Sequence, residues 1–158
     1  MPRLDCALPI ARTCLTRFLA AGLLAAGLAL PVGAAERLDG PYPADVLEVV
    51  DGDTLLVRAR IWLGTDVTVA VRLRGIDAPE ARGRCPAERD LARKATRRLG
   101  DLVADGSVHL TAITGDKYGG RVVATVTGSD GRVIADDLLG EGLARPYAGR
   151  ARAGWCGG

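Results

Sequence analysis

A change of hydrophobic period in the middle of this chain constrains its fold more than any other feature of the sequence. The run Val46 to Ala59 predicts two β segments around Asp51-Gly52-Asp53, and Val67 to Arg74 predicts a third. From Pro86 onward the apolar residues recur instead at spacings of three and four. This spacing predicts one amphipathic helix of about 18 residues.

Two further β segments and a second helix follow the predicted helix. Val108 to Ile113 and Arg121 to Val126 alternate in the strand manner and are separated by a glycine-rich loop. Apolar residues from Val133 to Leu143 indicate a shorter helix near the C-terminus. Five β segments with a helix after the third fit an α+β fold that is mainly β, a five-stranded barrel of the OB type. The face of such a barrel commonly binds nucleic acids or sugars.

The first 35 residues have the pattern of a secretory signal peptide. Three arginines precede an apolar run from Phe18 to Leu30, and Pro31 and small residues up to Ala35 follow. The run is shorter than the roughly 20 residues that span a bilayer. We therefore expect cleavage after Ala35, a single domain over residues 36–158, and a periplasmic or secreted location.

The charge balance excludes steering of nucleic acid by a global field. The chain has 21 Lys and Arg against 19 Asp and Glu, and cleavage would remove three Arg and one Asp, which leaves no net charge. Any site for a polyanion must therefore be local. Seven basic residues lie between Arg82 and Arg98, but acids at Glu80, Glu88 and Asp90 accompany them. This pattern favours a solvated helix face.

Cysteine and histidine are too few for most metal or nucleophile chemistry. Only Cys85 and Cys156 lie beyond the signal peptide, and export with an even count predicts one disulfide between them. It would close a loop of about 70 residues and add roughly 4 kcal/mol of stability. The single His109 alternates with apolar neighbours, which favours an outward-facing strand residue over a catalytic base. A zinc site of any usual ligand set is excluded.

Three short polar motifs are each ambiguous when taken alone. The sequence DGDT from Asp51 to Thr54 has the form of an ordinary hairpin turn. In RLRGIDAPE, Asp77 and Glu80 follow a strand and flank a proline, and they could simply cap the coming helix. In DKYGGR, Arg121 could be an ordinary basic residue at the edge of a hairpin.

In this order, with a helix between the second and third motifs, the chain resembles the staphylococcal nuclease (thermonuclease) family from about Val46 to Tyr147. The resemblance assigns a role to nine residues. It implies catalytic roles for Arg72, Glu80 and Arg121, calcium binding by Asp53, Asp77 and the carbonyl of Ala78, and nucleotide contacts by Lys117, Tyr118 and Tyr147.

Two departures from the family pattern accompany this resemblance. The pair Gly119-Gly120 is one residue longer than the single glycine of the prototype, which leaves open whether Arg121 reaches the phosphate. The chain also ends soon after GLARPY, where the prototype continues into a third helix. We expect the disulfide to Cys156 to hold the tail against the start of the first helix instead.

The chemistry of these residues agrees with the implied activity. Phosphodiester hydrolysis needs a hard cation and planar donors for the phosphate oxygens, and carboxylates with arginines supply both. The resemblance implies a Ca²⁺-dependent phosphodiesterase that hydrolyses DNA and RNA with little sequence preference and leaves 3′-phosphates. We expect it to act as a monomer. The alternatives are a catalytically inactive OB-type module that binds nucleic acid, and a disulfide-stapled envelope protein.

Overall fold

The structure is a computed structural model that describes residues 36–157. The expected signal peptide, residues 1–35, lies outside the described residues. No helix within residues 36–157 is long and apolar enough to cross a membrane.

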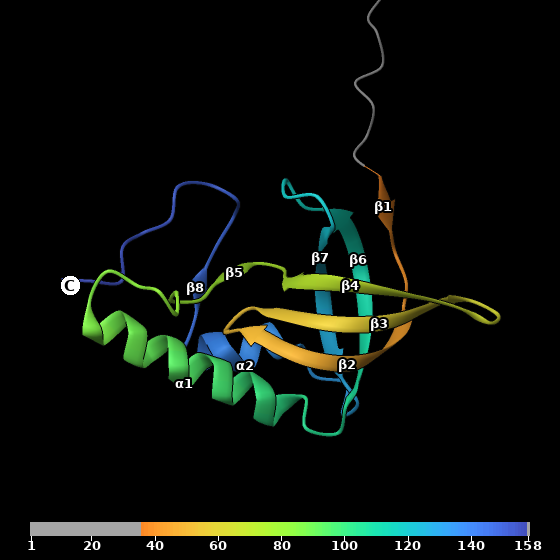
Figure 1. Ribbon diagram of the computed structural model, residues 1–158, viewed down its shortest axis with the longest axis horizontal. Coiled ribbons are helices and arrows are strands. Elements are labelled where there is room, and N and C mark those ends of the chain that lie inside the picture. Colours follow the sequence, from red (N-terminus) through yellow and green to blue (C-terminus); the bar gives the residue numbers. More distant parts are fainter. Residues whose placement is uncertain (1–35, 158) are drawn as a thin grey trace, which may run out of the picture. The chain divides into compact units, whose positions relative to one another are not determined.

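Five strands form a closed barrel, which confirms the predicted OB-type architecture (Figure 1). The ring runs in the order β6-β2-β3-β4-β7, and pairing of β6 with β7 closes it. All contacts between neighbours are antiparallel except that between β4 and β7. The barrel strands are β2 (Tyr42–Asp51), β3 (Thr54–Trp62), β4 (Thr65–Leu73), β6 (Ser107–Gly115) and β7 (Arg121–Gly128).

The barrel interior is filled by the aliphatic residues whose alternation predicted the strands. Along β3, Leu55, Val57 and Ala59 are buried, whereas Arg58 and Arg60 point outward. The same alternation buries Val108 and Leu110 of β6 and leaves His109 exposed, as its spacing predicts. The hydrophobic effect of this shared core therefore fixes the register of the strands.

Three two-residue strands were not expected from the sequence. They are β1 (Arg37–Leu38), β5 (Ile76–Asp77) and β8 (Arg145–Pro146). The pairing of β5 with β8 aligns Asp77 with Arg145, and the backbone amide of Tyr147 donates to the carbonyl of Gly75 over 2.8 Å. This small ladder brings the segment GLARPY beside the segment IDAPE.

Two helices cover one end of the barrel (Figure 1). Helix α1 (Pro86–Leu102) begins with proline in its first turn and buries Ala92, Ala95 and Leu99, as the spacing of three and four predicts. Helix α2 (Ile134–Gly140) is the short second helix. Helix α1 lies so close to the turn between β2 and β3 that a Cβ at Gly52 would be 2.8 Å from the Cβ of Ala95. Only glycine fits there.

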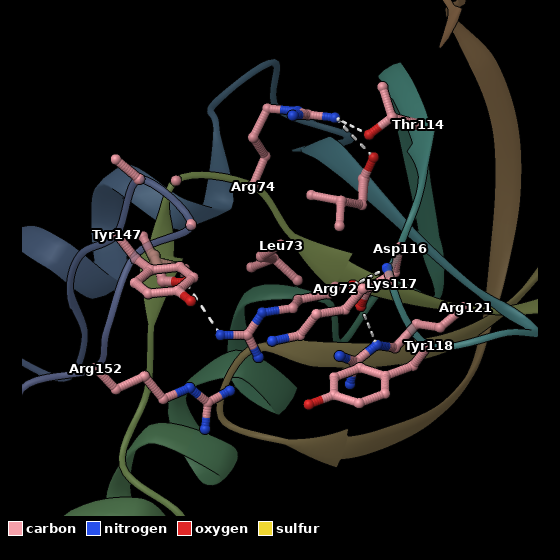
Figure 2. A pocket seen from close by; sticks show the side chains of 15 residues that line it. Arg72, Leu73, Arg74, Thr114, Asp116, Lys117, Tyr118, Arg121, Tyr147 and Arg152 are labelled. Carbon is pink, nitrogen blue, oxygen red and sulfur yellow. Dashed lines mark hydrogen bonds and ion pairs between the residues drawn. The ribbon is translucent and has the colours of Figure 1, made fainter. Parts of the chain in front are cut away.

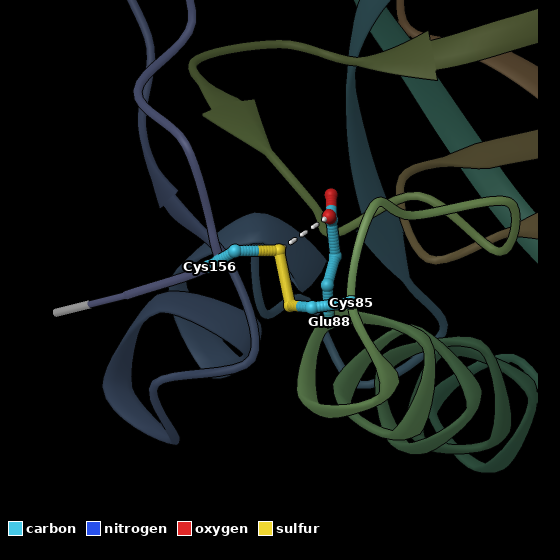
Figure 3. A group of neighbouring side chains, drawn as sticks. All are labelled: Cys85, Glu88 and Cys156. Carbon is cyan, nitrogen blue, oxygen red and sulfur yellow. Dashed lines mark hydrogen bonds between the residues drawn. A yellow bond between two sulfur atoms is a disulfide. The ribbon is translucent and has the colours of Figure 1, made fainter.

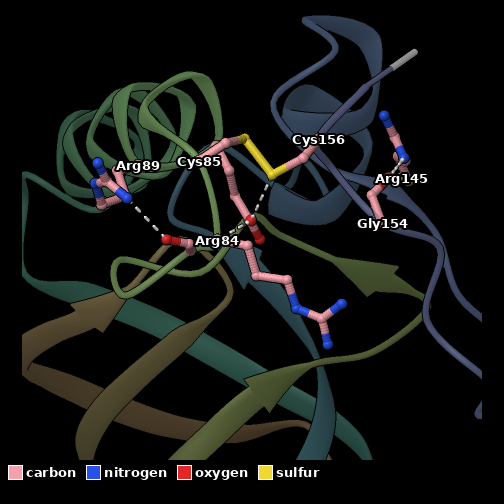
Figure 4. Close-up of a disulfide and its surroundings, with 8 residues drawn as sticks. Arg84, Cys85, Arg89, Arg145, Gly154 and Cys156 are labelled. Carbon is pink, nitrogen blue, oxygen red and sulfur yellow. Dashed lines mark hydrogen bonds between the residues drawn. A yellow bond between two sulfur atoms is a disulfide. The ribbon is translucent and has the colours of Figure 1, made fainter.

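The C-terminal tail is attached to the start of α1 (Figure 4). Cys85 and Cys156 form the predicted disulfide, with their Cα atoms 6.0 Å apart. Arg145 reinforces the attachment, because its guanidinium lies 3.9 Å from the centre of the Trp155 ring and donates to the carbonyl of Gly154 over 2.9 Å. The tail is therefore held at three adjacent residues, Gly154, Trp155 and Cys156.

Candidate active site

A buried arginine joins the two aspartates for which the sequence predicts metal binding. Arg72 on β4 donates from Nη1 to Oδ1 of Asp53 over 2.7 Å and from Nη2 to Oδ1 of Asp77 over 3.1 Å. The exposed fractions of these residues are only 8%, 3% and 5%. The DGDT turn and strand β5 place the two carboxylates side by side, so that one guanidinium binds both.

The backbone explains why Asp53 points toward Asp77. Thr54, the first residue of β3, pairs with Arg72 of β4, so the turn before it lies against the end of β4. The amide of Ala78 then donates to Oδ2 of Asp53 over 3.1 Å, and the Thr54 hydroxyl donates to its Oδ1 over 2.9 Å. Asp53, Asp77 and Ala78 therefore lie together, and their oxygens are of the kind that a hard cation such as Ca²⁺ takes.

Asp53 is held in an environment that disfavours its charge. Burial is the main cause, and it outweighs the attraction of Arg72 and raises the pKa of Asp53 to about 6. The repulsion from Asp51 acts in the same direction as burial. A group of this kind gains from a bound divalent cation, which compensates the buried negative charge.

This raised pKa predicts how the stability of the calcium-free protein depends on pH. The folded chain holds the Asp53 proton up to about pH 6, whereas the unfolded chain releases it near pH 4, so stability falls as pH rises between these values. Asp53→Asn mimics the protonated form. Its unfolding free energy in urea should match the parent near pH 4 and exceed it by up to about 3 kcal/mol at pH 7. A difference that does not grow with pH would contradict this assignment.

An open cleft of about 490 Å³ lies next to these carboxylates, and cationic side chains line it (Figure 2). Arg72 forms its floor beside Asp77, and Tyr147 closes one side, with its ring centre 5.9 Å from the Arg72 guanidinium. The other charged and aromatic residues of the cleft are Arg74, Asp116, Lys117, Tyr118, Arg121 and Arg152. Its size is that of a site for a small ligand or a single nucleotide.

Arg121 lies in this cleft despite the extra glycine before it. Gly120 adopts a φ of +78°, which a residue with a side chain rarely takes, and the loop closes with a hydrogen bond from the Asp116 amide to the Arg121 carbonyl. The Arg121 guanidinium bonds to Oδ2 of Asp116 over 2.5 Å and lies 5.1 Å from the Tyr118 ring centre. The same ring lies 5.0 Å from the Lys117 ammonium.

Sequence reasoning missed Asp116, although it begins the motif DKYGGR. Its carboxylate is nearly buried and fixes the direction of Arg121. Burial opposes its charge, but the hydrogen bond and charge of Arg121 prevail and lower the pKa of Asp116. The sequence does contain a signal for this pair, because Asp116 and Arg121 have opposite charges and lie five residues apart at the two ends of a glycine-rich loop.

Glu80 does not line the cleft but a second cavity beside it, and it is bound by a residue that no motif indicated. Its carboxylate is half exposed and pairs with Nη1 of Arg152, whose Nε also bonds to Oδ1 of Asp77 over 3.0 Å. Arg152 comes from the C-terminal tail, 72 residues from Glu80. Nothing in the local sequence of the tail marks this arginine.

The structure also contains a cluster that has the composition of a metal site but cannot act as one. Within residues 36–157, the donor atoms of Cys85, Glu88 and Cys156 lie within 4.8 Å of one another (Figure 3). Both sulfurs are joined in the disulfide, so no thiolate remains to bind a metal. Glu88 has another function there, because its Oε2 accepts a hydrogen bond from the Arg84 amide just before α1.

The barrel and the cleft together define an OB-type fold with cationic donors and buried carboxylates at one face. The family model described as staphylococcal nuclease homologue matches residues 70–154, more than half of the chain. The chain therefore belongs to the staphylococcal nuclease family. No curated protein matches the sequence. The matched segment includes the cleft residues of β4, β5, β7 and the tail, but Asp53 lies before it.

Proposed function

We propose that this protein is a calcium-dependent phosphodiesterase that hydrolyses DNA and RNA with little sequence preference. The observation that carries the proposal is the Asp53–Arg72–Asp77 group at the margin of an arginine-lined cleft. Family membership supports it, because proteins of this family are generally nucleases and typically depend on calcium. A pure binding module would not need two buried carboxylates beside its phosphate site.

Asp53, Asp77 and the carbonyl of Ala78 would hold the calcium ion. Two buried carboxylates and a carbonyl fit the oxygen ligands that calcium prefers, with water and phosphate completing six to eight positions. The bound ion would supply positive charge to a phosphate oxygen as negative charge develops there. The raised pKa of Asp53, caused by burial, means that the ion competes with a proton for this ligand below about pH 6.

The chain's own residues would perform the remaining steps. Arg72 and Arg121 border one cleft from two sides and can each hold phosphate oxygens through a planar pair of donors. Glu80 would orient the attacking water and accept its proton. Lys117 and Tyr118 would contact the outer phosphate of the nucleotide, and Tyr147 would stack on a base.

A digestion assay tests this function directly. Plasmid DNA and RNA should both be degraded in Ca²⁺ and remain intact in chelator, and the products should carry 3′-phosphates. Binding of nucleic acid without cleavage in Ca²⁺ would contradict the proposal and favour the inactive OB-type module.

Asp53→Ala tests the calcium site within this proposal. It removes a ligand but also a buried charge that is unfavourable without the ion, so Ca²⁺ affinity should fall about tenfold or more while the melting temperature changes little. The measurement is a calorimetric Ca²⁺ titration beside a thermal melt. Asp45→Ala is the matched control, because Asp45 is an exposed carboxylate on β2 that pairs with Arg58. An unchanged titration for Asp53→Ala would place the calcium site elsewhere.

The proposed setting is outside the cytoplasm, either periplasmic or secreted. The signal-peptide pattern and the disulfide support it, since stable disulfides form in oxidising compartments. A monomer would suffice for activity, because one chain supplies every residue of the proposed site.

A further inference from the structure

Arg152 occupies the space between a proposed metal ligand and the proposed general base. Its Nε bonds to Oδ1 of Asp77 over 3.0 Å and its Nη1 pairs with Oε1 of Glu80. The guanidinium borders the arginine-lined cleft on one side and a second cavity of about 310 Å³ on the other. Figure 2 shows it directed into the same space as the guanidinium of Arg72.

The contacts of the C-terminal tail hold the Arg152 side chain between Asp77 and Glu80. Only three residues separate Arg152 from Cys156, which the disulfide fixes at the start of α1. Trp155 packs on Arg145, and Arg145 binds the carbonyl of Gly154, so both residues before Cys156 are also held. The short tether keeps Arg152 at a high effective concentration beside Asp77 and Glu80.

Hydrogen bonds already use both lone pairs of Oδ1 of Asp77, one oxygen of a proposed metal ligand. A carboxylate oxygen offers two lone pairs, and Oδ1 of Asp77 accepts from Arg72 over 3.1 Å and from Arg152 over 3.0 Å. A divalent cation that binds this oxygen must displace one donor. Arg72 is buried and also held by Asp53, whereas the Arg152 side chain is 41% exposed, so Arg152 is the donor that leaves.

We propose that Arg152 is an internal competitor of the calcium ion, which holds Asp77 and Glu80 in the metal-free protein and releases both when the ion binds. This inference rests on the proposed function. In this proposal, the disulfide-held tail lowers the calcium affinity of the site. Its Arg152 also stays paired with Glu80 until the cation is bound. Glu80 is thereby freed for water only in the loaded site.

The test is a calorimetric Ca²⁺ titration of the purified protein and its Arg152→Gln variant. Loss of a half-exposed ion pair that opposes binding should tighten the apparent dissociation constant about fivefold or more. Arg152→Lys should give an intermediate value, because lysine keeps the charge but lacks the planar fork of donors with which Arg152 holds both carboxylates. Arg150→Gln is the matched control, since Arg150 is an exposed arginine of the same tail, and its titration should equal that of the parent. An unchanged or weaker affinity in Arg152→Gln would overturn the proposal.

A second variant tests the part played by the tether. The double change Cys85→Ser and Cys156→Ser frees the tail and should tighten calcium binding as Arg152→Gln does. Combining it with Arg152→Gln should add nothing, because both changes remove the same contact. Additive effects would mean that the tether acts on calcium by another route. If the serine pair does not fold, the Arg152→Gln titration still decides the proposal.

The outcomes separate this inference from the proposed function. If Arg152→Gln binds calcium more tightly but the parent cleaves no nucleic acid, the nuclease proposal fails and the competition stands. If the parent cleaves in calcium and the two titrations coincide, only the competition fails. If neither protein binds calcium, both are wrong.

Discussion

Replacing Glu80 by Gln should lower the turnover number for DNA by about 100-fold or more at saturating Ca²⁺. Glutamine keeps the shape of the side chain, but it cannot accept a proton from water. The loss should appear mainly in kcat, because Glu80 is half exposed and lines the neighbouring cavity, not the cleft that contains Tyr118 and Tyr147. Initial rates over a range of substrate concentrations measure both constants.

Glu141→Gln is the matched control for this change. Glu141 is also an exposed glutamate paired with an arginine, Arg98, but it lies just after α2 and outside the cleft. Loss of a surface ion pair of this kind should leave kcat unchanged and cost at most about 1 kcal/mol of stability. A kcat for Glu80→Gln within threefold of the parent would remove Glu80 from the mechanism.

The barrel could be predicted from the sequence because its strands and its main helix carry strong, local patterns. Alternation fixed the inward residues of β3 and β6, and the helical spacing after Pro86 fixed the buried face of α1. The pairing of β5 with β8 could not be found in this way. Each is only two residues long, and their contact depends on how the chain returns after α2.

The residues of the candidate site differ in the same way: some lie in local sequence patterns and some do not. Asp53, Arg72 and Asp77 lie in motifs at strand ends, and the register of β3 on β4 brings them together. Arg152 lies in a tail without periodicity, and its place follows from a covalent bond at Cys156. Even with that disulfide predicted, the sequence does not say which of the tail's arginines meets Glu80.

Arg72→Lys and Arg121→Lys should each depress kcat/KM by about 100-fold or more, which would identify a clamp of two arginines on the phosphate. Lysine keeps the charge but offers one compact ammonium in place of a planar pair of donors. The two variants should differ in stability. Arg72 is buried between two carboxylates, so its replacement should lower the melting temperature as well, whereas Arg121 has one ion pair at the cleft surface.

The comparison is decisive because the extra glycine affects only one of the two residues. Gly120 and the Asp116 carboxylate direct Arg121 into the cleft, so its reach depends on a loop, whereas that of Arg72 depends on a barrel strand. Both rates should be measured at temperatures where each variant is folded, with Arg132→Lys as a surface control that pairs with Asp130. If only Arg72→Lys loses activity, then Arg121 pairs with Asp116 and does not bind the phosphate. The second phosphate donor must then be another cation of the cleft, and Lys117 is the first to test.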